Sequence, residues 1–396
     1  MNDSLRDRLL TDLVRELDIP DNAYEAAESR YHDLGEWLRD ESKAKIAQFQ
    51  PLVSAQGSFR MGTVTKPWKT DHHDLDIGCS LQEGITPETC TQYDLKHLVG
   101  SDLYTYRSER RIQDEPEEKH RCWRLNYQDN LHFHADVVPC VPHSERIQAI
   151  IKSRMLQTGT SPLLAQDISK LAVAITDDRH PGYRRLDHDW YISNPEGYAR
   201  WFESRMKQAH ALLKSRTLQA KVGRIEDLPV FRWKTPLQAA IQILKRHRDV
   251  MYENLPERKP ISIIITTLAA HAYRGEFDLS DALIQILDNM CVNPSEPRVP
   301  NPVNAQEDFA DRWKSSEGRA LRLEENFFVW LEQAKRDFYA ILSPSDYGML
   351  PEHIRKRFGV SINQDLMRQI SGTLSPRISS PALHIKREMV PKPWGR

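Results

Sequence analysis

Two short segments of the chain alternate between apolar and polar residues, and this alternation constrains the fold more than any other feature. They cover residues 75–81 (Leu-Asp-Ile-Gly-Cys-Ser-Leu) and 131–137 (Leu-His-Phe-His-Ala-Asp-Val). Successive side chains of a β-strand point to opposite faces, so a period of two predicts strands with one buried face and one face available for function. Gly and Pro punctuate the chain between residues 51 and 141, and we expect a sheet there.

The N-terminal part of the chain has the periodicity of helices. Leu9, Leu13 and Leu17 repeat at a spacing of four, which predicts an amphipathic helix that ends before Pro20. Residues 24–49 continue with apolar positions at helical spacing, and we expect them to form one long amphipathic helix.

Helical periodicity returns after about residue 201. Thr235 and Pro236 are typical of a helix start, with a hydroxyl cap followed by Pro at the first helical position. Further helices are expected over 261–273 and 309–342, with an extended Pro-rich loop over 293–304. The order helices, sheet, helices predicts an α+β fold. We divide the chain into N-terminal helices (1–50), a sheet region (51–200), a C-terminal helical lobe (201–375) and a flexible, Pro-rich basic tail (376–396).

The composition excludes several classes of protein. With 55 Lys and Arg against 56 Asp and Glu, the 396-residue chain is not a protein that binds nucleic acid merely by being basic. Residues 200–260 hold 14 Lys and Arg against 6 Asp and Glu, which fits either a local basic surface or a solvated helical face. No apolar run approaches the ~18 residues of a membrane span. Five widely spaced cysteines without a CxxC pair favour reduced thiols and a cytoplasmic protein.

Three carboxylates stand on the polar faces of the two predicted strands. Asp74 and Asp76 are two residues apart, so a strand would turn both to one face with Cα atoms ~6.6 Å apart. Like charges this close are costly unless a cation holds them, and Mg²⁺ prefers carboxylate and phosphate oxygens. Asp136 lies on the face of the second predicted strand opposite to that of Phe133 and Val137, so its carboxylate can point outward from the sheet. Three such carboxylates could hold two metal ions ~3.5–4 Å apart.

A Gly-Ser pair precedes the carboxylates. Gly57 and Ser58 lie about 16 residues before Asp74, and at a loop-to-helix junction they would offer backbone N–H groups and a hydroxyl to a phosphate. Each element alone is weak, because such dipeptides are usually turns and strand aspartates are usually solvated. Their conjunction and order resemble the nucleotidyltransferase superfamily that shares its fold with DNA polymerase β.

Further motifs narrow this resemblance. In chain order they are Gly57 to Val64, Asp74 to Ile77, His134 to Pro139, Thr235 to Gln238, Lys245 to Asp249, Ile261 to Ile265, Asn301 to Asn304 and Phe309 to Trp313. With these motifs in this order, the chain from about residue 50 to 340 is similar to the bacterial cGAS/DncV-like nucleotidyltransferases (CD-NTases), the oligonucleotide cyclases of CBASS anti-phage systems. The resemblance implies an N-terminal helical spine, a polymerase-β-like core and a C-terminal helical lobe that encloses the site.

The resemblance also implies roles for individual residues. Asp74, Asp76 and Asp136 would be the metal-binding and catalytic carboxylates, with Asp136 helping to deprotonate the attacking hydroxyl. The donor triphosphate would lie against Gly57, Ser58, Lys245 and Ser262. A lysine charge and a helix-start hydroxyl also suit a γ-phosphate on physical grounds. Without the resemblance, the sequence favours the interpretation of Lys245 as a surface lysine and of Ser262 as a helix cap.

The predicted function is an enzyme that joins NTPs, ATP among them, into a cyclic di- or trinucleotide second messenger with Mg²⁺, which Mn²⁺ could replace. A regulatory CBASS protein is an expected partner, whereas a membrane and an obligatory nucleic acid are not. The alternatives are a nucleotidyltransferase that tails RNA or modifies a small molecule, and a catalytically silent nucleotide-binding scaffold. A zinc site built from His72, His73, His132, His134, His143, Cys79 and Cys140 is disfavoured, because no pair has zinc-finger spacing.

Overall fold

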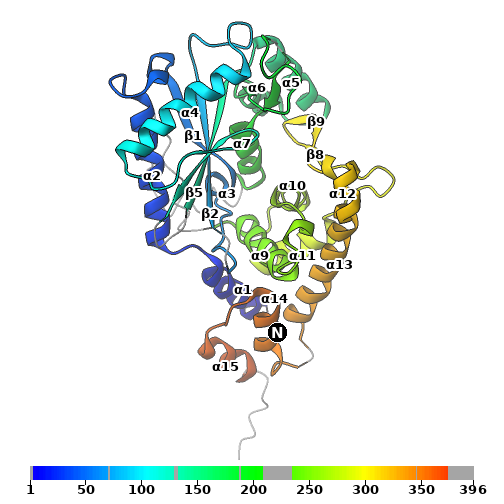
Figure 1. Cartoon of the computed structure of the whole chain (residues 1–396). Helices are drawn as coiled ribbons and strands as arrows, with labels where there is room; N and C mark the ends of the chain where they lie inside the picture. The colour runs from blue at the N-terminus through cyan, green and yellow to red at the C-terminus, as the bar shows by residue number, and fades with distance from the viewer. Residues whose placement is uncertain are drawn as a thin grey trace, which may run out of the picture.

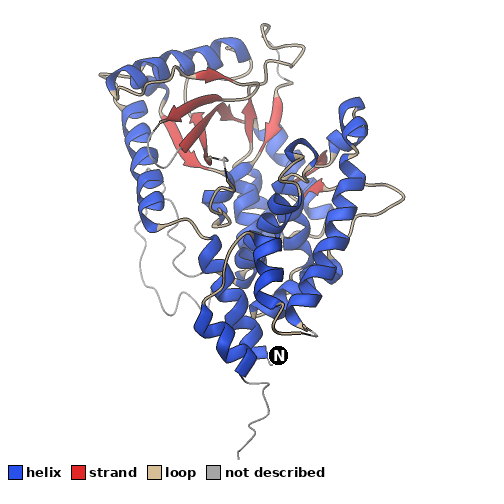
Figure 2. Cartoon of the chain, turned by 60° about the horizontal axis from the view of Figure 1, so that its bottom comes forward, coloured by secondary structure: helices blue, strands red, loops and turns tan. Residues whose placement is uncertain are grey.

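One half of the molecule is built on a seven-stranded mixed sheet, and the other half is helical (Figure 1, Figure 2). The computed structural model describes residues 3–69, 72–128, 133–186, 189–207, 234–344 and 346–372. The strands run in the order β1-β2-β5-β4-β3, with β6 paired to β5 and β7 paired to β6. Their bounds are β1 Pro51–Ala55, β2 His73–Leu81, β3 Glu117–Glu118, β4 Trp123–Tyr127, β5 Phe133–Pro142, β6 Val173–Ile175 and β7 Tyr191–Ser193.

The two predicted strands are β2 and β5, and they are direct neighbours. They pair in parallel, with Asp74 opposite His134 and Asp76 opposite Asp136. Alternation buries Leu75 and Ala135 on one face and turns the three aspartates to the other, as the period of two predicts. Residues 131 and 132 of the second predicted strand lie outside the described residues.

Helices α2 (Asp21–Arg39) and α4 (Gln92–Glu109) pack on the sheet half (Figure 1). The prediction of one helix over 24–49 is wrong, because α2 ends at Arg39 and a separate 3₁₀ helix covers Lys45–Phe49. The Asp40 carboxylate accepts hydrogen bonds from the Ser42 backbone N–H at 3.0 Å and from its hydroxyl at 2.5 Å. This local turn competes with continuation of the helix.

The helical half has its own hydrophobic core, which includes Leu9 and Trp330. Helix α1 packs against α9 and α11 rather than against the sheet. The N-terminal helices therefore divide between the two cores. The helices of this half are α1 Asp3–Leu17, α9 Pro236–Met251, α10 Ser262–Ala272, α11 Leu279–Asn289, α12 Ser316–Leu321, α13 Leu323–Leu342, α14 Leu350–Phe358 and α15 Gln364–Gly372.

The helix starts predicted in this half are largely confirmed. Thr235 and Gln238 form a reciprocal capping box at the start of α9, and α10 follows the helix expected over 261–273. The continuous helix expected over 309–342 is wrong: a 3₁₀ turn (Asp311–Lys314) and α12 precede α13. Arg322, between α12 and α13, has a left-handed φ of 59°, which no continuous right-handed helix allows.

Three further helices and a hairpin connect the halves. These are α5 Glu145–Gln157, α6 Pro162–Ser169, α7 Pro195–Arg205 and the strands β8 Pro300–Asn301 and β9 Asn304–Asp308. The loop expected over 293–304 therefore ends in a short two-stranded sheet, and β9 packs on α5. On α3 (Gly57–Met61), Arg60 donates to Glu196 and Glu203 of α7 at 2.9 and 2.6 Å.

Two regions predicted from the sequence, the Pro-rich tail and the basic region of residues 200–260, lie wholly or partly outside the described residues. The Pro-rich basic tail (376–396) lies outside the described residues, as do residues 208–233 of the basic region. In the described part of the chain, no helix is long and apolar enough to span a membrane.

Candidate active site

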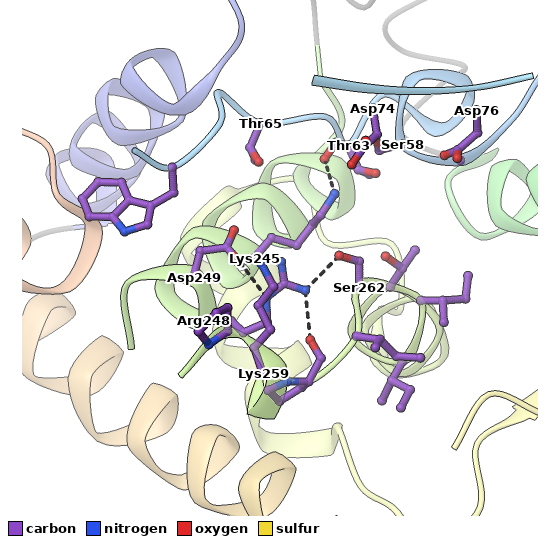
Figure 3. A pocket seen from close by; sticks show the side chains of 18 of the residues that line it. Ser58, Thr63, Thr65, Asp74, Asp76, Lys245, Arg248, Asp249, Lys259 and Ser262 are labelled. Atoms are coloured by element: carbon purple, nitrogen blue, oxygen red, sulfur yellow. Dashed lines mark hydrogen bonds and ion pairs between the residues drawn. The ribbon is translucent and has the colours of Figure 1, made fainter. Parts of the chain in front are cut away.

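A cavity of about 970 Å³ lies where the sheet half meets the helical half. All seven residues singled out from the sequence line it, so the fold brings together positions that are up to 205 residues apart, from Gly57 to Ser262. Asp74, Asp76 and Ser58 lie on the sheet side, and Lys245 and Ser262 lie opposite them (Figure 3).

The carboxylate side of the cavity is set by the register of β2 and β5. Asp76 and Asp136 are direct cross-strand partners, and Asp74 is 60% exposed at the rim. Desolvation and the negative charges of Asp136 and Asp74 raise the pKa of Asp76 to about 6. The carboxylates therefore repel one another, and a cation between them would stabilise the charged forms.

Arg124 on β4 is a member of this cluster that the sequence reasoning missed. Its Nε and Nη2 donate to the two oxygens of Asp136 at 2.7 Å each, and Nη2 lies 3.7 Å from Asp74 Oδ1. The hydrogen bonds to Asp136 raise the pKa of Arg124 above its ordinary value. The alternation of Trp123, Arg124 and Leu125 in the sequence was the signal that could have located it.

The donor set suits Mg²⁺ in its chemistry, because Mg²⁺ prefers carboxylate oxygens. Three carboxylates share one face of neighbouring strands, and burial, together with the charges of Asp136 and Asp74, raises the pKa of Asp76. As the side chains stand, however, no three His, Cys, Asp or Glu among the described residues close around a common metal position. Arg124 holds both oxygens of Asp136, so a metal ion would share that carboxylate with the guanidinium.

Gly57 has a specific reason to be glycine. It starts α3 with a φ of +60°, and a Cβ there would lie 2.0 Å from Asp76 Oδ2. Only glycine combines this backbone conformation with so close an approach. The next residue, Ser58, also lines the cavity, on the same side as Asp74 (Figure 3).

On the opposite wall, Lys245 is buried rather than a surface lysine. Its Nζ donates to the Thr63 carbonyl oxygen at 2.9 Å, in the segment that follows α3. Burial, with a contribution from the positive charge of Arg248, lowers the pKa of Lys245 to about 8. A desolvated ammonium group that faces the cavity attracts a polyanion strongly.

Ser262 is not the cap of its helix. The N-cap of α10 is Ile261, and no side chain caps that end. The Ser262 hydroxyl oxygen instead accepts a hydrogen bond from Arg248 Nη1 at 2.8 Å. Arg248, Asp249 and Lys259 also line the cavity, and the basic run of residues 245–248 was the sequence signal for this group.

A pair of histidines flanks the carboxylates. Nδ1 of His72 and Nε2 of His134 are 2.7 Å apart, and His134 Nδ1 lies 3.2 Å from Arg124 Nη1. His134 therefore contacts the group that holds Asp136 and lies beside the carboxylates. His132 lies outside the described residues, and the described histidines and cysteines contain no zinc-type cluster.

The sequence of the chain is similar to those of known proteins. Residues 51–139 match a family model described as the nucleotidyltransferase domain of cyclic GMP-AMP synthase DncV-like proteins. A c-di-GMP synthase from Roseivirga ehrenbergii is 31% identical over 293 residues, which cover 72% of this chain and 66% of that protein. The cyclic dinucleotide synthase CdnG from Bradyrhizobium diazoefficiens is 25% identical over 338 residues, with coverages of 78% and 71%.

A solved structure extends the similarity beyond the sheet half. The Bradyrhizobium diazoefficiens CdnG structure in complex with GTP has a TM-score of 0.62 and 20% identity, and covers 93% of this chain and 98% of that chain. The shared fold thus includes the helical half, which the family model leaves out. The matching family model and the 31% identical relative show that the chain belongs to the DncV-like nucleotidyltransferases, the CD-NTase family.

Proposed function

We propose that this enzyme joins two nucleoside triphosphates into a cyclic dinucleotide, with GTP as a substrate. The observation that carries the proposal is the cavity, in which Asp74, Asp76 and Asp136 face Lys245 and Ser262. The choice of GTP is supported by the relatives, since one is a c-di-GMP synthase and another is solved with GTP. The first product to look for is c-di-GMP, followed by the mixed product with ATP.

The reaction needs two kinds of group, and the two walls of the cavity offer one each. In each of two rounds, a ribose hydroxyl attacks an α-phosphorus, a new P–O bond forms, the bond to the β-phosphate oxygen breaks and pyrophosphate leaves. The carboxylates of β2 and β5 lie at one wall, and we propose that Asp136 takes the proton of the hydroxyl there. Lys245 and Ser262 at the other wall would hold the phosphates that leave.

The carboxylates also supply the ligands for the metal that the family resemblance implies. Asp74 and Asp76 come from one strand and Asp136 from its neighbour, and we assign all three as ligands of Mg²⁺, with Mn²⁺ as a substitute. When bound there, the metal would supply positive charge to the attacking oxygen and to the leaving pyrophosphate. Gly57 leaves the space beside Asp76 open, and Ser58 is proposed to contact the donor phosphates.

We infer the cellular location and the biological role of the protein from the same family resemblance. The described part of the chain contains no membrane-spanning helix, and the five cysteines are free, which supports synthesis in the cytoplasm, where NTPs are available. We propose a role in CBASS anti-phage defence, with a regulatory protein of that system as partner. Co-purification of the chain with the products of genes adjacent to its own tests this partner.

Product analysis tests the proposed reaction. The purified protein is incubated with Mg²⁺ and the four labelled NTPs, singly and in pairs, and the products are treated with phosphatase and identified by mass spectrometry. A phosphatase-resistant cyclic dinucleotide supports the proposal. Primer-dependent extension would point to RNA tailing instead, and tight NTP binding without pyrophosphate release would point to a silent scaffold.

A further inference from the structure

Arg248 lines the cavity together with the two predicted phosphate contacts, Lys245 and Ser262, and its guanidinium group meets Ser262 (Figure 3). Its side chain is 6% exposed. Nη1 donates to the Ser262 hydroxyl oxygen at 2.8 Å and to the Pro260 carbonyl oxygen at 3.0 Å. Nε and Nη2 donate to Asp249 Oδ1 at 2.9 and 2.6 Å. The guanidinium group therefore connects α9 to the loop and the first residue of α10.

These contacts leave Arg248 little capacity to bind a phosphate itself. A guanidinium group has five N–H donors in a fixed plane, and the four hydrogen bonds to Asp249, Pro260 and Ser262 engage most of them. Asp249 also lies 3.5 Å from Lys259 Nζ, so its carboxylate neutralises much of the local positive charge. The geometry is that of a structural hydrogen-bond donor, which links Asp249, Pro260 and Ser262, rather than that of a phosphate ligand.

The hydrogen bond from Arg248 determines the orientation of the Ser262 hydroxyl. A hydroxyl group has one proton and two lone pairs. Because the oxygen of Ser262 accepts from Arg248, its proton is turned away from the guanidinium group. The Pro260 carbonyl is held at the same time, so the backbone that leads into α10 cannot shift the hydroxyl.

We propose that Arg248 is a positioning residue that orients Ser262 as a hydrogen-bond donor to the terminal phosphate of a bound NTP. The proposal rests on the proposed function, in which Ser262 contacts the triphosphate. It makes Arg248 a determinant of the preference for triphosphate over diphosphate, because the hydroxyl that it orients contacts the terminal phosphate. Preorganisation of this kind raises affinity by removing the cost of ordering the donor at binding.

The test is the ratio of affinities for a triphosphate and a diphosphate, measured without turnover. Isothermal titration with Mg²⁺ uses two guanine nucleotides with a methylene bridge between the α- and β-phosphates, one with and one without the γ-phosphate. Loss of a hydrogen bond to a charged group should lower the triphosphate preference about tenfold or more in Ser262→Ala. Arg248→Gln should lower it to a similar extent, with diphosphate affinity nearly unchanged.

Two further variants separate positioning from general damage. Lysine cannot donate to three partners in one plane, so Arg248→Lys should lose the preference as Arg248→Gln does. The double variant Arg248→Gln/Ser262→Ala should be no worse than Ser262→Ala, because both changes remove the same contact. Arg258→Gln, in the nearby 3₁₀ turn (Pro256–Arg258), is the matched control and should keep the wild-type ratio.

The outcomes are distinct from those that test the reaction itself. If Arg248→Gln keeps the wild-type triphosphate preference, or if its effect adds to that of Ser262→Ala, the positioning role is wrong. Equal weakening of both nucleotides, with a lowered melting temperature, would also overturn it in favour of a structural role. Failure of the wild-type protein to form a cyclic dinucleotide would instead overturn the proposed function, whatever the binding ratios show.

Discussion

The two walls of the cavity are built in different ways. The carboxylate wall depends on one parallel strand pair, in which register places Asp76 opposite Asp136. The phosphate wall depends on α9, whose polar side chains reach across to the other half of the molecule. Gln238 donates to Met61 O, Gln242 to Val64 O, Lys245 to Thr63 O and Arg246 to Lys66 O.

This difference shows why polar residues are buried on α9. Its side chains donate to four carbonyl groups at the end of α3 and in the segment that follows it, which would otherwise be left unpaired at the junction of the two halves. The same helix holds Lys245 in the cavity. Substitutions in the carboxylate wall should therefore affect chemistry most, whereas substitutions in α9 should affect binding and stability.

The largest effect is expected from the carboxylates. Asp74→Asn with Asp76→Asn should lower turnover about a thousandfold or more, because the ligands for the metal lose their charge. The melting temperature should be kept or raised, since the raised pKa of Asp76 shows that its charged form is unfavourable in the fold. Pyrophosphate release and differential scanning fluorimetry measure the two quantities. A double variant with the wild-type rate would make the metal assignment wrong.

Gly57→Ala tests the same wall through sterics. The added Cβ would meet Asp76 Oδ2 at 2.0 Å, so the carboxylate must move, and we expect turnover to fall about a hundredfold, since small displacements of catalytic groups have effects of this size. Gly159→Ala is the control, because Gly159 has a φ of +85° but nothing within 4 Å of the added Cβ. It should cost about 1 kcal/mol of stability and leave the rate unchanged. Equal rates in both variants would refute the close approach.

The phosphate wall should respond to pH through Lys245. Its pKa is lowered to about 8, so the charge is present below pH 8 and is lost as the pH rises through that value. The KM for GTP should rise about tenfold between about pH 7.5 and pH 9.5. At saturating GTP the change should occur at higher pH, because the bound triphosphate favours the charged amine.

Lys245→Arg is the control for this pH dependence, since arginine stays charged throughout. Its KM should be nearly constant over the same interval, and a parallel rise would assign the titration to another group. A rise in pH should weaken GTP binding but stabilise the fold. Between pH 8 and the ordinary lysine pKa of 10.5, Lys245 holds its proton more often in the unfolded chain than in the folded one. The free energy of unfolding should therefore increase with pH in that window.

The smallest effect is expected from Gln238. Its side chain caps α9 and donates to Met61 O at 2.9 Å. Gln238→Ala should lower the free energy of unfolding by about 1–3 kcal/mol, because a buried carbonyl loses its partner. Urea denaturation measures this value, and kcat at saturating GTP should stay within about twofold of wild type. A large loss of kcat with unchanged stability would show that α9 acts on the chemistry directly.

Sequence patterns predicted the carboxylate wall better than the phosphate wall. The alternation around Asp76 and Asp136 correctly places them on one face of a sheet, because strand periodicity is local. Alternation could place Arg124 on the polar face of a strand but not beside Asp136, since the pairing of β4 with β5 depends on how the strands assemble. The break at Asp40 and the left-handed Arg322 were missed because helical periodicity continues through both positions.

The sequence by itself determined the α+β order of the elements, the strand faces that carry the three aspartates and the likeness to the nucleotidyltransferase family. Only the tertiary structure decided that Lys245 is buried with a lowered pKa, that Arg248 holds Ser262 and that Arg124 holds Asp136. The reason is physical. Which face a side chain takes follows from backbone geometry within a few residues, whereas burial, hydrogen-bond partners and pKa depend on segments brought together across the whole chain.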